Sequence, residues 1–525
     1  MAMLTTGFAA SKGDDWALID EFGTTTWAEL DERVNRLVNA WRDRGVVNGS
    51  TIAVVLGNRR EWFEVALGGA HGGVTYVPVN WHFVADELAY LFGDAGAVAV
   101  VVDERYAAAV AAALTDERSR SVEVVIGVGN DVPADLRARP GYVAYEELLA
   151  SGSPDEPSEQ RLGGPMFYTS GTTGRPKGVR GALSGGGELT PDIMQLVAAG
   201  FGQMMPVPGR TLLCGPFYHS AQWAFSFLPM IGGSSVVMQH KYDSAEAVQL
   251  IDRHAVTNTH LVPTQMKRLV DLSDEVKASF SGATLVAVWH GAAPCPPSVK
   301  RGLIDWWGPK ITEYYGSTEG SVISTITSQE WLAKGGSVGK PMSTVDVLVI
   351  GDDDSEVAPG QEGTLYFRNK MGMSFSYHND ADKTAKAHRE PGVFTTGDVG
   401  YLDADGYLWL SDRRIDMIIS GGVNIYPAEI EGVLAAHRAV ADVAVIGVPN
   451  EEFGEEVKAI VQVADGVAGD AHLVDELISH CRGLLAGYKC PRSVDFIGEI
   501  PRTGTGKIQK QPLRAPYWEG LQRRI

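Results

Sequence analysis

Cysteine is scarce in this sequence, and the signals of export and membrane insertion are missing. The 525 residues contain four cysteines, Cys214, Cys295, Cys481 and Cys490, and no two of them lie in a C-x-x-C spacing. Cysteines this sparse form neither a disulfide framework nor a zinc motif. No uncharged apolar run reaches the ~18 residues of a membrane span, and the first residues lack a basic segment followed by an apolar one. We therefore expect a protein of the reducing cytoplasm without a transmembrane segment, and peripheral membrane contact is left open.

Positive charge is also in deficit. Lys and Arg together number 45 against 65 Asp and Glu, which gives a formal net charge of −20. A surface of this charge repels a phosphate backbone, so nucleic acid is not an expected partner. The hydrophobic (44%), aromatic (9%) and charged (21%) fractions are those of an ordinary globular protein and exclude a disordered or collagenous chain.

Short β-branched runs alternate with amphipathic stretches over most of the sequence. Runs at 52–56, 74–80 and 97–103 are separated by helical patterns around Trp62 and Leu88. The same rhythm returns at 211–216, 234–239, 259–264, 284–291 and 311–316, and Asp243 with Glu246 has the spacing of a helix capping box. This alternation indicates βαβ units and largely parallel sheets, in which ligands bind beyond the carboxyl ends of the strands.

After about Leu410 the pattern changes to shorter units. A helix is expected from Pro427 and another near Leu477, with strands around Val443, Val457 and Val494. We therefore predict an α/β fold with two domains. Residues 1–411 form a large N-terminal domain of parallel-rich sheets with flanking helices, and residues 412–525 form a small, mobile α+β C-terminal domain.

The segment YTSGTTGRPKGV, residues 168–179, is rich in groups that bind anions. Glycines let backbone N–H groups turn toward an anion, hydroxyls donate further hydrogen bonds, and a lysine adds a point charge. A polyphosphate suits such a loop, although a surface turn is the alternative for any bare Gly/Ser/Thr stretch. Pro176 and Gly178 exclude a Walker A motif. The candidate phosphate-binding residues are Thr169, Ser170, Gly171, Thr172, Thr173, Gly174 and Lys177.

This string resembles the phosphate loop of the ANL superfamily, which comprises acyl-CoA synthetases, adenylate-forming luciferases and adenylation domains of peptide synthetases. Further motifs match in the same order as far as Lys507. The resemblance implies that a carboxylic acid reacts with MgATP to give an acyl adenylate, and that the small domain then turns so that the thiol of coenzyme A displaces AMP.

Three motifs of the large domain acquire roles from the resemblance. In YYGSTEG, residues 314–320, Tyr315 before Gly316 packs on adenine, Thr318 contacts phosphate and Glu319 binds Mg²⁺, for which a carboxylate is a suitable ligand. In HGAAP, residues 290–294, the small residues Gly291, Ala292 and Ala293 permit close approach of the adenine. In the segment 396–414, Asp398 accepts from both ribose hydroxyls and Arg413 joins it.

The small domain contributes two further motifs by the same resemblance. In PRTGTGKIQK, residues 501–510, Lys507 enters the site during adenylation and offsets the charge that builds up as pyrophosphate leaves. In SGGVNIYPAEIE, residues 420–431, Gly421 and Gly422 let the pantetheine arm pass, or they form a plain turn. The chain departs from the family at the hinge, where Ile415 stands in place of the usual Asp or Lys; either the hinge works without a charged side chain there, or the pivot is displaced to Arg414 or Asp416.

The acyl site is expected in PFYHSAQWAFSFLPMIGG, residues 216–233. The resemblance places His219 at the junction of acyl pocket and thiol tunnel, with a core histidine as the alternative. Trp223, Phe225, Phe227 and Met230 are candidates to line the pocket, but core packing accounts for at least half of them.

The expected activity is that of an AMP-forming acyl-CoA ligase for an apolar acid, such as a medium- or long-chain fatty acid or a branched or steroid side-chain acid; an aryl acid also stays open. The first alternative is an enzyme that loads a separate carrier protein. A luciferase-like oxygenase and a non-catalytic nucleotide-binding protein are weaker alternatives. A homodimer is left open.

Overall fold

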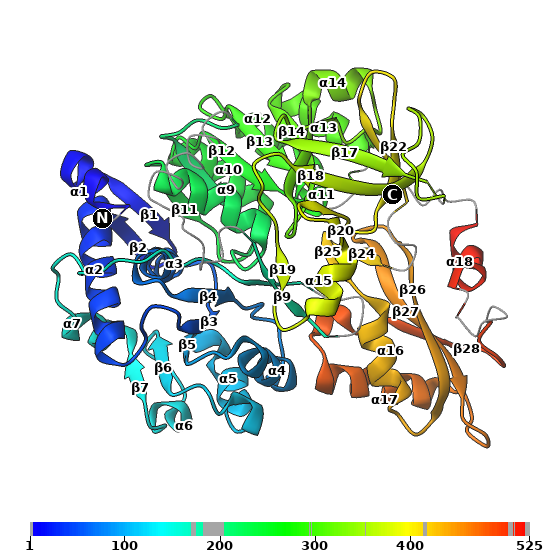
Figure 1. Ribbon diagram of the computed structural model, residues 1–525, viewed down its shortest axis with the longest axis horizontal. Coiled ribbons are helices and arrows are strands. Elements are labelled where there is room, and N and C mark those ends of the chain that lie inside the picture. Colours follow the sequence, from blue (N-terminus) through cyan, green and yellow to red (C-terminus); the bar gives the residue numbers. More distant parts are fainter. Residues whose placement is uncertain are drawn as a thin grey trace.

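The computed structural model describes residues 4–169, 175–181, 204–292, 295, 297–351, 353–412, 417–501, 508 and 510–519. It has a mixed α/β fold with a large N-terminal and a small C-terminal part, as the sequence predicts (Figure 1). Within these residues no helix is long and apolar enough to span a bilayer. None of the four cysteines, all of which lie within the described residues, forms a disulfide.

A five-stranded parallel sheet occupies the first third of the chain. Its order is β4-β3-β5-β6-β7, and every pairing is parallel. Side chains alternate along β3: Ile52 and Val54 face one apolar core, while Ala53 and Val55 face another. The strands are β3 (Thr51–Val55), β4 (Thr75–Pro78), β5 (Ala99–Asp103), β6 (Val124–Val128) and β7 (Tyr142–Ala144).

Helices cover both faces of this sheet. One core contains side chains of α2, α3, α7 and α9, and the other contains side chains of α4 and α5. The bounds are α1 (Thr6–Lys12), α2 (Trp27–Asp43), α3 (Arg60–Gly72), α4 (Ala85–Ala95), α5 (Ala107–Ala113), α6 (Ala134–Arg137), α7 (Tyr145–Ser151) and α9 (Ser220–Ile231).

A nine-stranded sheet forms the second layer of the large part, in the order β16-β15-β14-β13-β12-β10-β11-β1-β2. Its centre, from β14 to β1, is parallel. The strands are β1 (Trp16–Asp20), β2 (Gly23–Thr26), β10 (Arg210–Leu213), β11 (Ser235–Met238), β12 (Asn258–Leu261), β13 (Ala287–His290), β14 (Ile311–Ser317), β15 (Ser321–Thr327) and β16 (Lys340–Pro341).

Its outer face is covered by α10 (Ser244–Arg253), α11 (Pro263–Val270) and α13 (Pro297–Trp307). The predicted helix start at Asp243 is confirmed, because the Asp243 side chain accepts a hydrogen bond from the N–H of Glu246 at 2.7 Å. Two shorter helices are α12 (Asp274–Ser279) and α14 (Ser328–Ala333).

Two antiparallel sheets complete the large part, and the sequence did not predict them. β8 (Phe167–Thr169), β9 (Lys177–Arg180) and β19 (Ser376–Tyr377) form one of them. The other contains β17 (Val345–Ile350), β18 (Gly363–Asn369), β20 (His388–Glu390), β21 (Val393–Phe394), β22 (Val399–Leu402) and β23 (Leu408–Asp412), and α15 (Ala381–Ala387) lies beside them.

The small part is built on one sheet with helices on both faces. β24 (Ile418–Ser420), β25 (Val423–Ile425), β26 (Val440–Asn450), β27 (Gly454–Val463) and β28 (Ser493–Phe496) form the sheet. α16 (Pro427–Ala435) and α17 (Ala471–Leu484) pack on one face, and α18 (Lys510–Trp518) packs on the other (Figure 1). The elements expected around Pro427, Val443, Val457, Leu477 and Val494 are all present.

Candidate active site

The ends of the candidate phosphate loop are held in a β-hairpin. Thr169 on β8 lies opposite Lys177 on β9. The ammonium of Lys177 pairs with the carboxylate of Asp380, the N-cap residue of α15, and this contact lowers the pKa of Asp380. Ser170, Gly171, Thr172, Thr173 and Gly174 lie outside the described residues.

β14 brings Tyr315 next to Asp398. The Tyr315 hydroxyl donates a hydrogen bond to the Asp398 carboxylate, and Thr396 donates to the same oxygen at 2.7 Å. These residues are far apart in sequence, and each was assigned separately to the adenosine of ATP. Their contact brings the two motifs together, with Asp398 held by two hydroxyls.

Thr318 and Glu319 connect this region to two other segments. Thr318 Oγ1 lies 3.0 Å from Ser220 Oγ, which places it beside His219 at the start of α9. The Tyr377 hydroxyl donates to Glu319 Oε1 at 3.0 Å. Burial raises the pKa of Glu319. A neighbouring cation would favour its ionised form.

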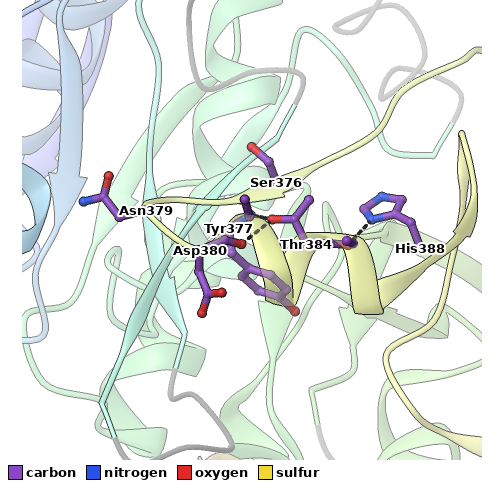
Figure 2. Close-up of a pocket in the computed structure, with 8 residues that line it drawn as sticks. Ser376, Tyr377, Asn379, Asp380, Thr384 and His388 are labelled. Carbon is purple, nitrogen blue, oxygen red and sulfur yellow. Dashed lines mark hydrogen bonds between the residues drawn. The ribbon is translucent and has the colours of Figure 1, made fainter.

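Residues of β19, of α15 and of the turn between them, together with His388, line an open pocket with a volume of about 570 Å³. Figure 2 shows Tyr377 and Asp380 pointing to the same side of the helix, and Ser376 pointing to the opposite side. Since Tyr377 bonds to Glu319 and Asp380 pairs with Lys177, this side adjoins both the phosphate-loop hairpin and the candidate Mg²⁺ ligand.

His219 is held in its neutral form. Burial, and secondarily the nearby His82, lower the pKa of His219 to about 4. On the same helix Trp223, Phe227 and Met230 belong to the core between the two sheets, whereas Phe225 belongs to a separate cluster. Core packing thus accounts for three of the four apolar side chains considered for the acyl pocket.

That separate cluster lies behind the turn after β13. Phe225, Trp289, Tyr314 and Met205 form its buried members. A Cβ atom added to Gly291 would lie 2.6 Å from two ring carbons of Tyr314, so only glycine allows this close approach. Ala292 has a φ of +68°, a strained conformation of the kind found at ligand sites. Ala293 lies outside the described residues.

The glycine pair of the small part lies against the large part. Gly421 and Gly422 both have positive φ, and a Cβ on Gly422 would lie 3.3 Å from the Val262 side chain. Val262 follows β12, so the pair lies at the carboxyl edge of the nine-stranded sheet. Arg413, the hinge position Ile415 and Lys507 lie outside the described residues.

The metal-binding groups around Glu319 are better suited to Mg²⁺ that arrives bound to ATP than to a metal ion held permanently by the protein. Mg²⁺ is commonly bound through one or two carboxylates together with substrate phosphates, and Glu319 supplies one carboxylate. In the described part of the chain, no three His, Cys, Asp or Glu residues are grouped so that they could hold a metal ion.

Sequence reasoning missed Tyr377 and Asp380. They belong to no motif, and their role depends on the pairing of β19 with β9, about 200 residues earlier in the chain. The sequence contains no local signal that could have found them.

Comparison with known proteins identifies the class. The AMP-binding enzyme family matches residues 6–377, and the AMP-binding enzyme C-terminal domain matches residues 429–507. The chain belongs to this family of adenylate-forming enzymes, as its motifs predicted.

Relatives over nearly the full length are CoA ligases. The chain is 32% identical to an indoleacetate–CoA ligase of Aromatoleum aromaticum, covering 93% of this chain and 92% of the relative. It is 32% identical to a 3-oxocholest-4-en-26-oate–CoA ligase of Rhodococcus rhodochrous (94% and 91%). It is 29% identical to a medium/long-chain fatty-acid–CoA ligase of Mycobacterium tuberculosis (95% and 87%).

Solved structures of related enzymes share the fold. An amide bond synthetase from Marinactinospora thermotolerans superposes with a TM-score of 0.84 at 27% identity, covering 98% of this chain and 99% of that one. An o-succinylbenzoate CoA synthetase from Bacillus subtilis, in complex with ATP and magnesium ion, gives 0.66 at 25% identity (97% and 98%). The expected AMP-forming acid–thiol ligase, which uses ATP, Mg²⁺ and CoA, is confirmed at the level of the family.

Proposed function

We propose that this ligase activates an apolar carboxylic acid, either a medium- or long-chain fatty acid or a branched or steroid side-chain acid. The observation that supports an apolar acid is the buried cluster of Phe225, Trp289, Tyr314 and Met205, directly behind the Gly291 turn. Apolar and aromatic walls are typical of sites for such ligands. Relatives whose names specify fatty, steroid and aryl acids agree with this class but do not select one member.

In the proposed first step, a carboxylate oxygen of the acid attacks the α-phosphorus of ATP, and the bond to pyrophosphate breaks. Tyr315 packs on the adenine, and Asp398 accepts from the ribose hydroxyls together with Arg413. Lys177 and the hydroxyls of Thr169 and of the loop 170–174 donate to the phosphates. Orientation and charge stabilisation of this kind are the main means of accelerating phosphoryl transfer chemistry.

The remaining side chains act on the reacting groups. Thr318 contacts phosphate, Glu319 binds the Mg²⁺ that accompanies ATP, and Lys507 offsets charge at the α-phosphate. In the second step the CoA sulfur attacks the acyl carbon, the bond to AMP breaks, and the thiol proton passes to solvent. Neutral His219 lies at the junction of acyl pocket and thiol path, and Gly421 with Gly422 lines that path.

The boundary between domains 1–411 and 412–525, and a cytoplasmic location, are parts of the same proposal. β23 of the large part ends at Asp412 and β24 of the small part begins at Ile418, which supports a boundary close to this position. The lack of a disulfide among the four cysteines of the described residues supports a reducing compartment.

The test is pyrophosphate release from ATP and Mg²⁺ over a panel of fatty, branched, steroid and aryl acids, each with and without CoA. CoA-dependent turnover of an apolar acid, with its thioester found by mass, is the expected result. Pyrophosphate release at the same rate with and without CoA would favour a carrier protein as the acyl acceptor. Preference for a polar acid would refute the proposed substrate class.

A matched pair of variants tests the nucleotide site. Asp398→Asn should raise the KM for ATP at least tenfold, because a neutral amide accepts more weakly from the ribose hydroxyls. Asp403→Asn is the control, because Asp403 accepts from the N–H groups of Asp405 and Tyr407 in a turn. Equal KM values for the two variants would contradict the role of Asp398.

A further inference from the structure

A short 3-10 helix of the small part, η3 (Gly487–Lys489), contacts the large part through the buried side chain of Lys489 and the half-buried side chain of Tyr488. Lys489 Nζ lies 2.7 Å from Glu87 Oε1, and these side chains are 3% and 6% exposed. Asn80 Nδ2 donates to the hydroxyl of Tyr488 at 3.1 Å. Asn80 lies shortly before α4 and Glu87 lies in its first turn, so the start of α4 and the residues before it form the contact surface for η3.

Lys489 also pairs with Glu429 on α16, at 2.8 Å. Glu429 belongs to the same part of the chain as Lys489, whereas Glu87 belongs to the other. A rotation of the small part therefore leaves the pair between Lys489 and Glu429 intact and separates Lys489 from Glu87. Removing one partner of a buried ion pair costs much more free energy than removing one partner of an exposed pair.

The exposed ion pair between Arg268 and Glu452 also joins the two parts, at 2.8 Å. Its side chains are 45% and 57% exposed. Solvent and salt screen such a pair, so it contributes little to orientation. It provides a built-in comparison for the buried contact of Lys489 with Glu87.

The orientation held by these contacts brings Gly421 and Gly422 against the large part, beside Val262 and Thr264. In the same orientation Ile508, the residue after Lys507, packs with Ala444, Leu513 and other side chains of the small part, on the face opposite α16. Gly421 and Gly422, between β24 and β25, thus face the large part, whereas Ile508 packs with α18 on the other face of the small sheet; β24, β25 and α18 are labelled in Figure 1.

We propose that Glu87 and Lys489 are positioning residues for thioester formation: their buried ion pair holds the small part in the orientation that presents Gly421 and Gly422 to the site. This inference rests on the proposed two-step reaction. Adenylation needs Lys507 at the phosphates and therefore an orientation in which this pair is separated. The pair should accelerate the second step without assisting the first.

The variant Glu87→Gln tests this assignment. Glutamine keeps the size of the side chain and can still accept the hydrogen bond that Glu87 receives from the N–H of Val84 at the start of α4. Loss of the charge should slow thioester formation from supplied acyl adenylate and CoA about tenfold. Single-turnover release of pyrophosphate without CoA should change less than twofold.

Glu452→Gln is the matched control, since it removes the exposed pair by the same substitution and should change both rates less than twofold. Hydrogen exchange supplies a readout that does not depend on turnover. Peptides containing residues 80–90 and 485–492 should exchange faster in Glu87→Gln than in Glu452→Gln.

The outcomes separate two kinds of failure. If the wild-type enzyme forms neither adenylate nor thioester, the proposed function is wrong and the positioning role of Glu87 and Lys489 is refuted together with it. If the wild type performs both steps but Glu87→Gln slows both equally, or neither, the positioning role alone is refuted. If Glu87→Gln does not fold, Asn80→Ala must show the same selective loss, because it removes the hydrogen bond to Tyr488.

Discussion

The substitution Gly291→Ala tests the turn between the nucleotide motif and the aromatic cluster. The new Cβ would lie 2.6 Å from Cε1 and Cζ of Tyr314 and 2.8 Å from its carbonyl oxygen. Non-bonded carbon atoms prefer a separation of at least ~3.5 Å, so the Tyr314 ring or the turn at Gly291 must move by about 0.9 Å. The ring cannot move freely, because its hydroxyl lies 3.1 Å from His260 Nε2 and its face packs near Phe225.

Relief must therefore come partly from the backbone of the turn or of β14, which also contains Tyr315. Overpacking of this size costs about 1–3 kcal/mol of the free energy of unfolding. A displacement near 1 Å in a catalytic site can lower the rate about 100-fold. We expect a lower melting temperature and a loss of about 10- to 100-fold in kcat/KM for ATP, measured by pyrophosphate release.

The matched control is Gly432→Ala on α16, where a Cβ meets nothing within 4 Å. Because Gly432 is exposed in a helix, alanine there should raise the stability by about 0.5–1 kcal/mol and leave the kinetics unchanged. If Gly291→Ala matches this control in stability and in kcat/KM, the close contact at Gly291 has no functional consequence and our reasoning is refuted.

Three further predictions concern other parts of the chain. Lys507→Ala should abolish most adenylation and spare thiolysis of supplied acyl adenylate; equal loss of both half-reactions would indicate a structural role. Lys300→Met should lower the free energy of unfolding by about 3–5 kcal/mol, because it leaves Glu313, 2.6 Å from the buried ammonium, without its partner; unchanged urea unfolding would contradict this. His71 Nε2 accepts a hydrogen bond from the N–H of Leu4, and burial lowers the pKa of His71 to about 4, so the folded state disfavours its protonation. Stability should therefore fall by up to about 3 kcal/mol between pH 6.5 and pH 4, and a His71→Gln variant that shows the same acid loss in thermal unfolding would refute this assignment.

Local patterns were enough to predict the central architecture. Alternation of β-branched runs and amphipathic stretches predicted the parallel strands β3 to β5 and β10 to β14, since side-chain periodicity depends on neighbours along the chain. Helix starts at Asp243 and Pro427 were predicted for the same reason. The antiparallel strands between Val345 and Asp412 were not predicted, because they follow one another with little helix between them and so lack the alternation that indicated the parallel sheets.

The sequence alone determined the family and the candidate residues, because the motif around 168–179 and the segments near Glu319 and Asp398 are contiguous strings whose chemistry can be read locally. Only the tertiary structure decided which of these groups meet. Tyr315 with Asp398, and Lys489 with Glu87, are contacts across 83 and 402 positions of the chain. Such contacts depend on how whole sheets pack against one another, and no local periodicity specifies that packing.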